Sequence, residues 1–177
     1  MMVHYNTLSI LGKTLDMRNE LPAIKILVGT MTGNAERVAE EIELSFDDRA
    51  RIATLDMDRL TPAVFDDDAV FLICSSTYGQ GDVPDNARDF YKLLGEHKPD
   101  LRHVRYGVIS LGDMTYAQTF ANGGKRFDAI LTELGATRLG AVFCHDASIG
   151  TLPEDEAVPW AGEWLDMVAE SMLAQQL

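Results

Sequence analysis

Short apolar segments alternate with helix-period segments along this chain, and this alternation limits its possible folds more than any other feature. The apolar segments are Ile24–Val28, Arg51–Leu55, Ala69–Cys74, Tyr106–Leu111 and Leu139–Cys144. A run such as AVFLIC is apolar at successive positions, which is typical of a strand that is buried on both faces. Such strands need helices on both sides of the sheet. We therefore predict an α/β fold, a parallel sheet between two helical layers.

Apolar residues recur at helical spacing between the expected strands and after the last one. The stretch 56–68 should hold a further crossover helix, but it is short and acidic and its helical pattern is weak. Five strands joined in this way fit a doubly wound sheet in the order 2-1-3-4-5. The residues that define the four stronger helices are Ala35, Val38, Ala39, Ile42 and Phe46; Ala87, Phe90, Tyr91 and Leu94; Phe127, Ile130, Leu131 and Leu134; and Ala161, Trp164, Leu165, Val168 and Met172.

The first 21 residues stand apart from this pattern. They contain a modest apolar patch and no basic segment of the kind that opens a signal peptide. We interpret residues 1–21 as a peripheral extension or a start-site error, with Met17 as a possible alternative start. The remaining residues, 22–177, are enough for one domain with a core of its own.

The net charge of the chain limits the classes of partner that it can bind. It carries 15 Lys and Arg against 28 Asp and Glu, a net charge of −13, which argues against nucleic acid. Acids dominate residues 40–68 and 154–170, either for solubility or as a steering surface for a basic partner protein. No apolar run approaches the roughly 20 residues of a membrane span. Two cysteines cannot complete a four-ligand zinc site, and we expect no metal.

In a sheet of this order, ligands bind beyond the carboxyl ends of the strands. The loop after the first strand, TMTGNAE (30–36), offers hydroxyls, a glycine and the free amides of a helix N-terminus, a combination that binds phosphate. It contains neither G-x-x-x-x-G-K-[ST] nor G-x-G-x-x-G, so it is neither a nucleoside-triphosphate loop nor a dinucleotide fingerprint. The alternative is that Thr32 or Asn34 simply caps the helix.

Two further loops each carry a tyrosine just past a strand end. Tyr78 is followed by Gly79 and Gly81, and Tyr116 follows the fourth strand, with glycine nearby. Aromatic rings in such places can stack on a flat ring, and glycines bring the backbone close to a ligand. The alternatives are a turn with a half-buried tyrosine, and packing of Tyr116 and Phe120 against the next helix. Together the three loops predict a phosphate cradle and two aromatic plates at one sheet edge.

These loops resemble those of flavodoxins. TMTGNAE resembles the T-x-T-G-N phosphate loop of the family, and STYGQGDVPDNA and LGDMTYAQTF resemble the flavin loops of the flavodoxin domains of diflavin reductases. Residues 98–113 and 152–165 are most similar to the short-chain, MioC-like kind of flavodoxin. The resemblance covers about Ile24 to Met172. It implies the flavodoxin-like, three-layer doubly wound fold and an FMN-binding domain at 22–177.

The resemblance implies FMN as the cofactor and assigns roles to the loops. The first loop would bind the phosphate, Tyr78 and Tyr116 would stack on the isoalloxazine ring, and Thr77 and Gly79 would meet the ring edge. Asp113 stands where diflavin reductases usually have a neutral residue. No catalytic residue is assigned, and His145 is interpreted as structural. The expected cofactor-binding residues are Thr30, Met31, Thr32, Gly33, Asn34, Ala35, Ser76, Thr77, Tyr78, Gly79, Gly81, Leu111, Gly112, Asp113, Tyr116, Phe120, Asn122 and Asp146.

By this resemblance the protein is expected to be a cytoplasmic, monomeric electron carrier. It would take single electrons from a flavoprotein reductase and pass them to a metal-centre or radical enzyme, both with basic surfaces. The alternative function is an FMN-dependent NAD(P)H or quinone oxidoreductase, so whether it is an enzyme stays open. A signalling receiver would need an aspartate where the chain has Ser75 to Thr77, and a flavin-free binding module would not need the three loops.

Overall fold

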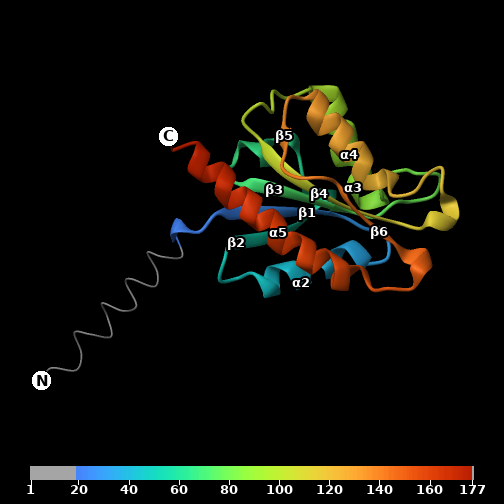
Figure 1. Cartoon of the computed structure of the whole chain (residues 1–177). Coiled ribbons are helices and arrows are strands. Elements are labelled where there is room, and N and C mark those ends of the chain that lie inside the picture. Colours follow the sequence, from blue (N-terminus) through green and yellow to red (C-terminus); the bar gives the residue numbers. More distant parts are fainter. Residues whose placement is uncertain (1–18, 177) are drawn as a thin grey trace, which may run out of the picture.

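The strands of the computed structural model, which describes residues 19–176, form one parallel sheet (Figure 1). Their order is β2-β1-β3-β4-β5, with β6 also paired to β4. The predicted order 2-1-3-4-5 is therefore confirmed, with one additional strand. The strands are β1 (Ala23–Gly29), β2 (Arg51–Asp56), β3 (Val70–Ser75), β4 (Arg105–Gly112), β5 (Thr137–Arg138) and β6 (Phe143–Asp146).

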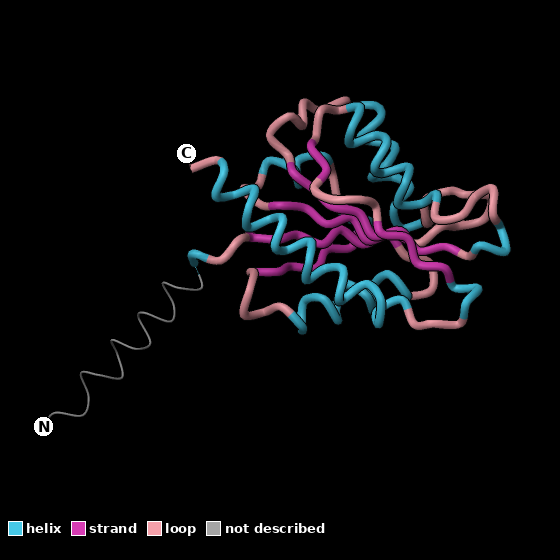
Figure 2. The backbone as a smooth tube through the Cα atoms, in the orientation of Figure 1, coloured by secondary structure: helices cyan, strands magenta, loops and turns pink. Residues whose placement is uncertain are grey.

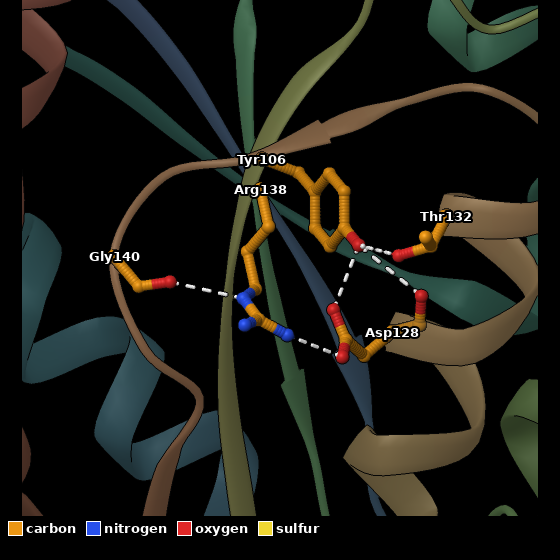
Figure 3. Close-up of polar contacts among 5 residues, drawn as sticks. All are labelled: Tyr106, Asp128, Thr132, Arg138 and Gly140. Atoms are coloured by element: carbon orange, nitrogen blue, oxygen red, sulfur yellow. Dashed lines mark hydrogen bonds and ion pairs between the residues drawn. The ribbon is translucent and has the colours of Figure 1, made fainter.

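The predicted fifth strand, Leu139–Cys144, is wrong in its boundaries. Two short strands occupy that edge of the sheet, β5 beside the start of β4 and β6 beside its end. Gly140 has φ +74°, a left-handed conformation that interrupts an extended strand. A polar network holds the break in place (Figure 3). Within it, Arg138 donates to the carbonyl of Gly140 (2.9 Å) and pairs with Asp128 of α4 (Asn122–Glu133).

Tyr106, on the neighbouring strand β4, also belongs to this network (Figure 3). Its hydroxyl donates to the Asp128 carboxylate over 2.7 Å, so the Thr132 hydroxyl, 2.9 Å away, donates to Tyr106 in turn. Burial raises the pKa of Tyr106 to about 12, so the phenol stays protonated over the physiological range. The network thus joins β4, β5 and α4 without leaving the buried hydroxyl unpaired.

The helices form the two outer layers. Figure 1 shows α2 and α5 together on one face of the sheet and α3 and α4 on the other. The expected crossover at 56–68 consists of two 3₁₀ helices rather than an α-helix, because Pro62 lacks an N–H and Thr61 before it is extended. The remaining elements are α2 (Asn34–Ser45), α3 (Asp85–His97), α5 (Pro153–Ala174), η1 (Met57–Arg59), η2 (Pro62–Asp66), η3 (Met114–Tyr116) and η4 (Ala147–Ile149).

The core lies on both faces of the sheet, as the apolar strands predict. Along β3, Leu72 and Cys74 face the layer of α2 and α5, whereas Phe71 and Ile73 face the layer of α3 and α4. Every residue of β3 is buried. Cys74 is fully buried in the core, and this burial raises the pKa of its thiol to about 12.

This arrangement brings the loops of interest together. The loops that follow β1, β3, β4 and β6 gather at one end of the sheet, opposite the end where the described chain begins and finishes (Figure 2). Parallel strands with short connections from strand to helix produce this clustering.

The expectation about the N-terminal extension largely concerns residues 1–18, which lie outside the described residues. The domain boundary predicted at residue 22 stays a prediction, although β1 begins beside it at Ala23. Within residues 19–176, none of the helices combines the length and hydrophobicity that a membrane crossing needs.

Gly107 of β4 lies directly against Trp164 of α5, and this close approach provides a test of the packing. A Cβ at this position would lie 2.3 Å from Nε1 of Trp164 and 2.5 Å from its Cε2. We expect Gly107→Ala to lower the free energy of unfolding by about 1–3 kcal/mol, because the rigid indole must move. Urea denaturation measures the change.

Gly95→Ala is the matched control. Its Cβ would meet only the Ile130 methyl group at 3.9 Å, an ordinary contact on the exposed side of α3. We expect this change to raise the free energy of unfolding by up to about 1 kcal/mol, because alanine favours the helix. A Gly107→Ala protein as stable as the wild type would contradict the packing described here.

Candidate functional site

A cleft of about 700 Å³ lies at the carboxyl ends of β1, β3, β4 and β6. Loops from all four strands contribute to its walls, so residues far apart in the sequence face one space. Volumes of this size are usual for small-molecule and cofactor sites. The predicted residues that line it are Met31, Thr32, Asn34, Ser76, Thr77, Tyr78, Gly79, Leu111, Gly112, Asp113 and Tyr116.

The first loop leads into a helix without a side-chain cap. Gly33, at the N-cap of α2, has φ +86°, a conformation that favours glycine, and no side chain caps the helix. The alternative that Thr32 or Asn34 serves only as a cap is therefore wrong for the described structure. The amides of the first turn of α2 have no acceptor within the described residues, and a helix N-terminus of this kind favours an anion. The hydroxyl of Thr30 steadies the turn by accepting from Gly33 N–H (3.0 Å).

Asn86, a residue that the sequence analysis did not single out, fixes the start of this loop. Its side-chain oxygen accepts from Thr30 N–H (2.8 Å), and its side-chain nitrogen donates to the Val28 carbonyl (3.2 Å). Asn86 lies in the first turn of α3, which follows the neighbouring strand β3. The sequence signal for this role was the asparagine in the segment VPDNA. Only the adjacency of β1 and β3 in the sheet shows that its side chain holds the loop after β1.

The second loop is a tight hairpin that presents Tyr78. The N–H of Tyr78 donates to the Asp82 carbonyl (2.9 Å), and Asp82 N–H donates back to Tyr78 (2.8 Å). Gly79 (φ +53°) and Gly81 (φ +92°) make the turn possible. Gly81 is buried below the cleft, where a Cβ would lie 2.8 Å from the side-chain nitrogen of Asn122. Tyr78 as a whole residue remains 43% exposed, and it lines the cleft.

Thr77 joins the second loop to the third. Its hydroxyl donates to the Leu111 carbonyl (2.9 Å) and accepts from Gly123 N–H (3.0 Å). A Cβ on Gly123 would lie 2.0 Å from the Ser76 carbonyl oxygen, so the two loops are in close contact. The Thr77 hydroxyl hydrogen is thus engaged in positioning the walls of the cleft.

The third loop carries Tyr116 on η3. Its side chain is 67% exposed and lines the cleft, so it does not pack inside against α4. Asp113 also lines the cleft, and its carboxylate caps η3 by accepting from Thr115 N–H (2.8 Å). Phe120 and Asn122 are not among the residues that line the cleft. Their contact with a cofactor stays a prediction.

Asp146, at the end of β6, ties the third loop to the fourth. One carboxylate oxygen accepts from Met114 N–H (2.8 Å) on η3 and from Ser148 N–H (2.9 Å) on η4. These bonds, Met114 first, lower the pKa of Asp146 below its ordinary value. Asp146 thus supports the wall of the cleft by holding η3 and η4 together. Its direct contact with a cofactor stays a prediction.

The fourth loop contributes residues that the sequence analysis left out. Buried His145 lines the cleft and lies 3.1 Å, through Nε2, from the hydroxyl oxygen of Thr151. The Thr151 hydroxyl donates to Glu156, so it accepts from an Nε2–H of His145. Thr151, Leu152 and Pro153 line the same wall. The interpretation of His145 as structural agrees with this chain of hydrogen bonds, which spans the loop.

A family model described as flavodoxin matches residues 26–160. The chain belongs to the flavodoxin family. This flavodoxin is 41% identical over 142 residues to Flavodoxin YqcA of Escherichia coli (strain K12), an alignment that covers 80% of this chain and 95% of that protein. It is 33% identical over 148 residues to Protein MioC of the same strain, covering 82% and 97%. The resemblance to short-chain, MioC-like flavodoxins is therefore confirmed.

Two further comparisons concern a solved structure and a longer protein. The solved structure of a single-residue mutant of a flavodoxin from Pseudomonas aeruginosa superposes with a TM-score of 0.73 at 30% identity, covering 82% of this chain and 97% of that one. The sulfite reductase [NADPH] flavoprotein alpha-component of Bacillus subtilis is 33% identical over 151 residues, which span 84% of this flavodoxin but 24% of that protein. Flavodoxin family proteins bind a flavin, typically FMN, and transfer electrons.

The bonds of Asp146 predict a titration at the rim of the cleft. Because the folded pKa is lowered, the stabilisation is present above the ordinary aspartate pKa of about 3.9 and is lost as pH falls through the lower folded value. We expect the Met114 amide resonance to titrate with a midpoint below about 3.9, as measured by NMR. In Asp146→Asn this titration should vanish. A midpoint at or above that value would contradict the described bonds.

Proposed function

We propose that this flavodoxin binds FMN in the cleft and carries single electrons from a flavoprotein reductase to an acceptor enzyme. The observation that carries the proposal is the meeting of an uncapped helix N-terminus with two exposed tyrosines in one cleft. A ligand that joins a flat aromatic ring to a phosphate could stack on the tyrosines and bind the helix N-terminus at the same time. Neither feature alone selects such a ligand.

The phosphate end suits a monophosphate that is held by neutral donors. The open amides of the first turn of α2 point along the helix axis, where the helix dipole favours an anion. Thr32 and Asn34 line the cleft beside them and can donate further hydrogen bonds. The Thr30 hydroxyl accepts from Gly33 N–H, so its own hydrogen can still be donated to a phosphate.

The ring end suits the isoalloxazine of FMN. Tyr78 and Tyr116 come from neighbouring loops, and their exposed rings can stack on a planar ligand. The contact of Thr77 with Leu111 and Gly123 holds these loops together, which reduces the entropy lost on binding. The Gly79 carbonyl accepts no hydrogen bond within the described residues, so it is available to a ligand.

The redox chemistry belongs to FMN, which takes up and returns electrons one at a time, and the protein tunes its potentials. Asp113 lines the cleft and Asp146 supports its wall. Their carboxylates disfavour additional negative charge nearby, so they lower the potential for the second electron. The exposed rim leaves the ring edge within reach of another protein.

The partners proposed here follow from charge. A net charge of −13 supports an encounter with basic-surfaced redox proteins, whose attraction to the acidic runs speeds association. The name of the Bacillus subtilis relative, a sulfite reductase flavoprotein component, supports a flavoprotein reductase as the donor class. We place this carrier in the cytoplasm and infer that it acts as a monomer.

The deciding experiment is to purify the protein without added flavin, record its visible spectrum and titrate it with dithionite. We expect a yellow protein, or one that turns yellow on addition of FMN, that is reduced in two separate one-electron steps. A colourless protein that FMN does not reconstitute would overturn the proposal. Steady oxidation of NAD(P)H by the isolated protein would instead favour the oxidoreductase function.

Replacement of one tyrosine tests the stacking. We expect Tyr116→Ala to weaken FMN binding about tenfold, because an exposed aromatic contact of this kind contributes about 1 kcal/mol beyond the area it buries. Tyr116→Phe keeps the ring and should retain most of the affinity. Quenching of FMN fluorescence on titration with the apoprotein measures both. Equal losses in the two variants would show that the hydroxyl, and not stacking, is responsible.

A further inference from the structure

Arg37 is the only Lys or Arg among the described residues that line the cleft. It is the fourth residue of α2, and its side chain is 55% exposed. Side chains of a helix lean toward its N-terminus, so the guanidinium reaches back toward the open amides of the first turn. The exposure shows that Arg37 does not serve the core.

Glu154, in the first turn of α5, is the only acid that pairs with Arg37 among residues 19–176. The distance from Nη1 of Arg37 to Oε1 of Glu154 is 3.9 Å, longer than a hydrogen bond. Within the described residues the Arg37 side chain donates no hydrogen bond. The guanidinium is therefore held near the cleft by charge while its planar set of N–H donors stays available.

The second oxygen of Glu154 shows that this carboxylate is not neutralised by hydrogen bonds within the described residues. Oε2 is buried and has no hydrogen-bond partner within the described residues, although the side chain as a whole is 15% exposed. Glu154 does not itself line the cleft, but its carboxylate lies 3.9 Å from Arg37, which does, and a negative charge this close disfavours an anion at that wall. Asp113 adds a further negative charge to the lining. A phosphate that binds here needs a positive charge between itself and these carboxylates.

We propose that Arg37 is the residue that makes this cleft prefer FMN to riboflavin, by placing its guanidinium between Glu154 and the phosphate. This inference rests on the proposed binding of FMN and adds a charged contact to the neutral donors of the loop. Arg37 would donate to phosphate oxygens, for which its planar fork is suited, while Glu154 keeps the side chain in place. Riboflavin, which lacks the phosphate, would gain nothing from Arg37.

The test compares the dissociation constants of FMN and riboflavin for the apoprotein, measured by flavin fluorescence. In the wild type we expect FMN to bind more tightly than riboflavin. Arg37→Gln should weaken FMN binding about 10- to 100-fold, the loss typical of a charged hydrogen bond, because the phosphate loses the one Lys or Arg among the described residues that line the cleft. Riboflavin binding should stay within about threefold, as for an exposed substitution, and this also shows that the variant folds.

Arg49→Gln is the matched control. Arg49 also pairs with α5, through Asp166 at 2.7 Å, but it lies beyond the far end of α2, roughly 18 Å from the N-terminus of that helix. The substitution removes the same charge and should leave the preference for FMN intact. Added salt should weaken FMN binding more steeply in the wild type than in Arg37→Gln, because screening acts on the charged contact.

The outcomes separate the two proposals. If the wild type prefers FMN and Arg37→Gln retains that preference, the role of Arg37 is overturned while FMN binding stands. If Arg49→Gln loses the preference as fully as Arg37→Gln, the effect is one of net charge and the specific contact is overturned. If the wild type binds neither flavin, the proposed function itself fails.

Discussion

The parallel register of the central strands is the constraint on which the rest of the structure depends. Gly29 of β1 lies opposite Ser75 of β3, Ser75 opposite Ser110 of β4, and Gly112 opposite Asp146 of β6. Backbone hydrogen bonds fix these pairs, and a shift of one residue would turn every buried side chain to the other face. Because the strands end nearly level, the loops that follow them open onto the same space.

The loops are held by side chains that bond to the backbone of a neighbouring loop. Asn86 fixes the loop after β1, Thr77 connects the loops after β3 and β4, and Asp146 connects those after β4 and β6. Each bond crosses from one strand connection to the next. A cleft built in this way is largely formed before a ligand enters, so the binding free energy is not used to order its walls. The exposed tyrosines stand on this rigid frame.

The carboxylates around the cleft impose a second requirement on the binding of a phosphate. An acidic protein with carboxylates around its site suits an encounter with basic partners, yet the same carboxylates oppose a phosphate. In the proposed complex, the helix amides and Arg37 would offset this opposition locally.

The first four strands, the sheet order and the three loops that line the cleft could be predicted from the sequence, because these depend on local hydrophobic pattern and on short motifs such as TMTGNAE. The break at Gly140 was missed, since there the network of Tyr106, Asp128 and Arg138 outweighs the apolar run of the last strand. The uncapped state of α2, the bond of Asn86 to Thr30 and the pairing of Arg37 with Glu154 were decided by the tertiary structure. Those contacts join residues that are distant in the chain, and hydrophobic periodicity carries no information about which polar groups will meet across a sheet.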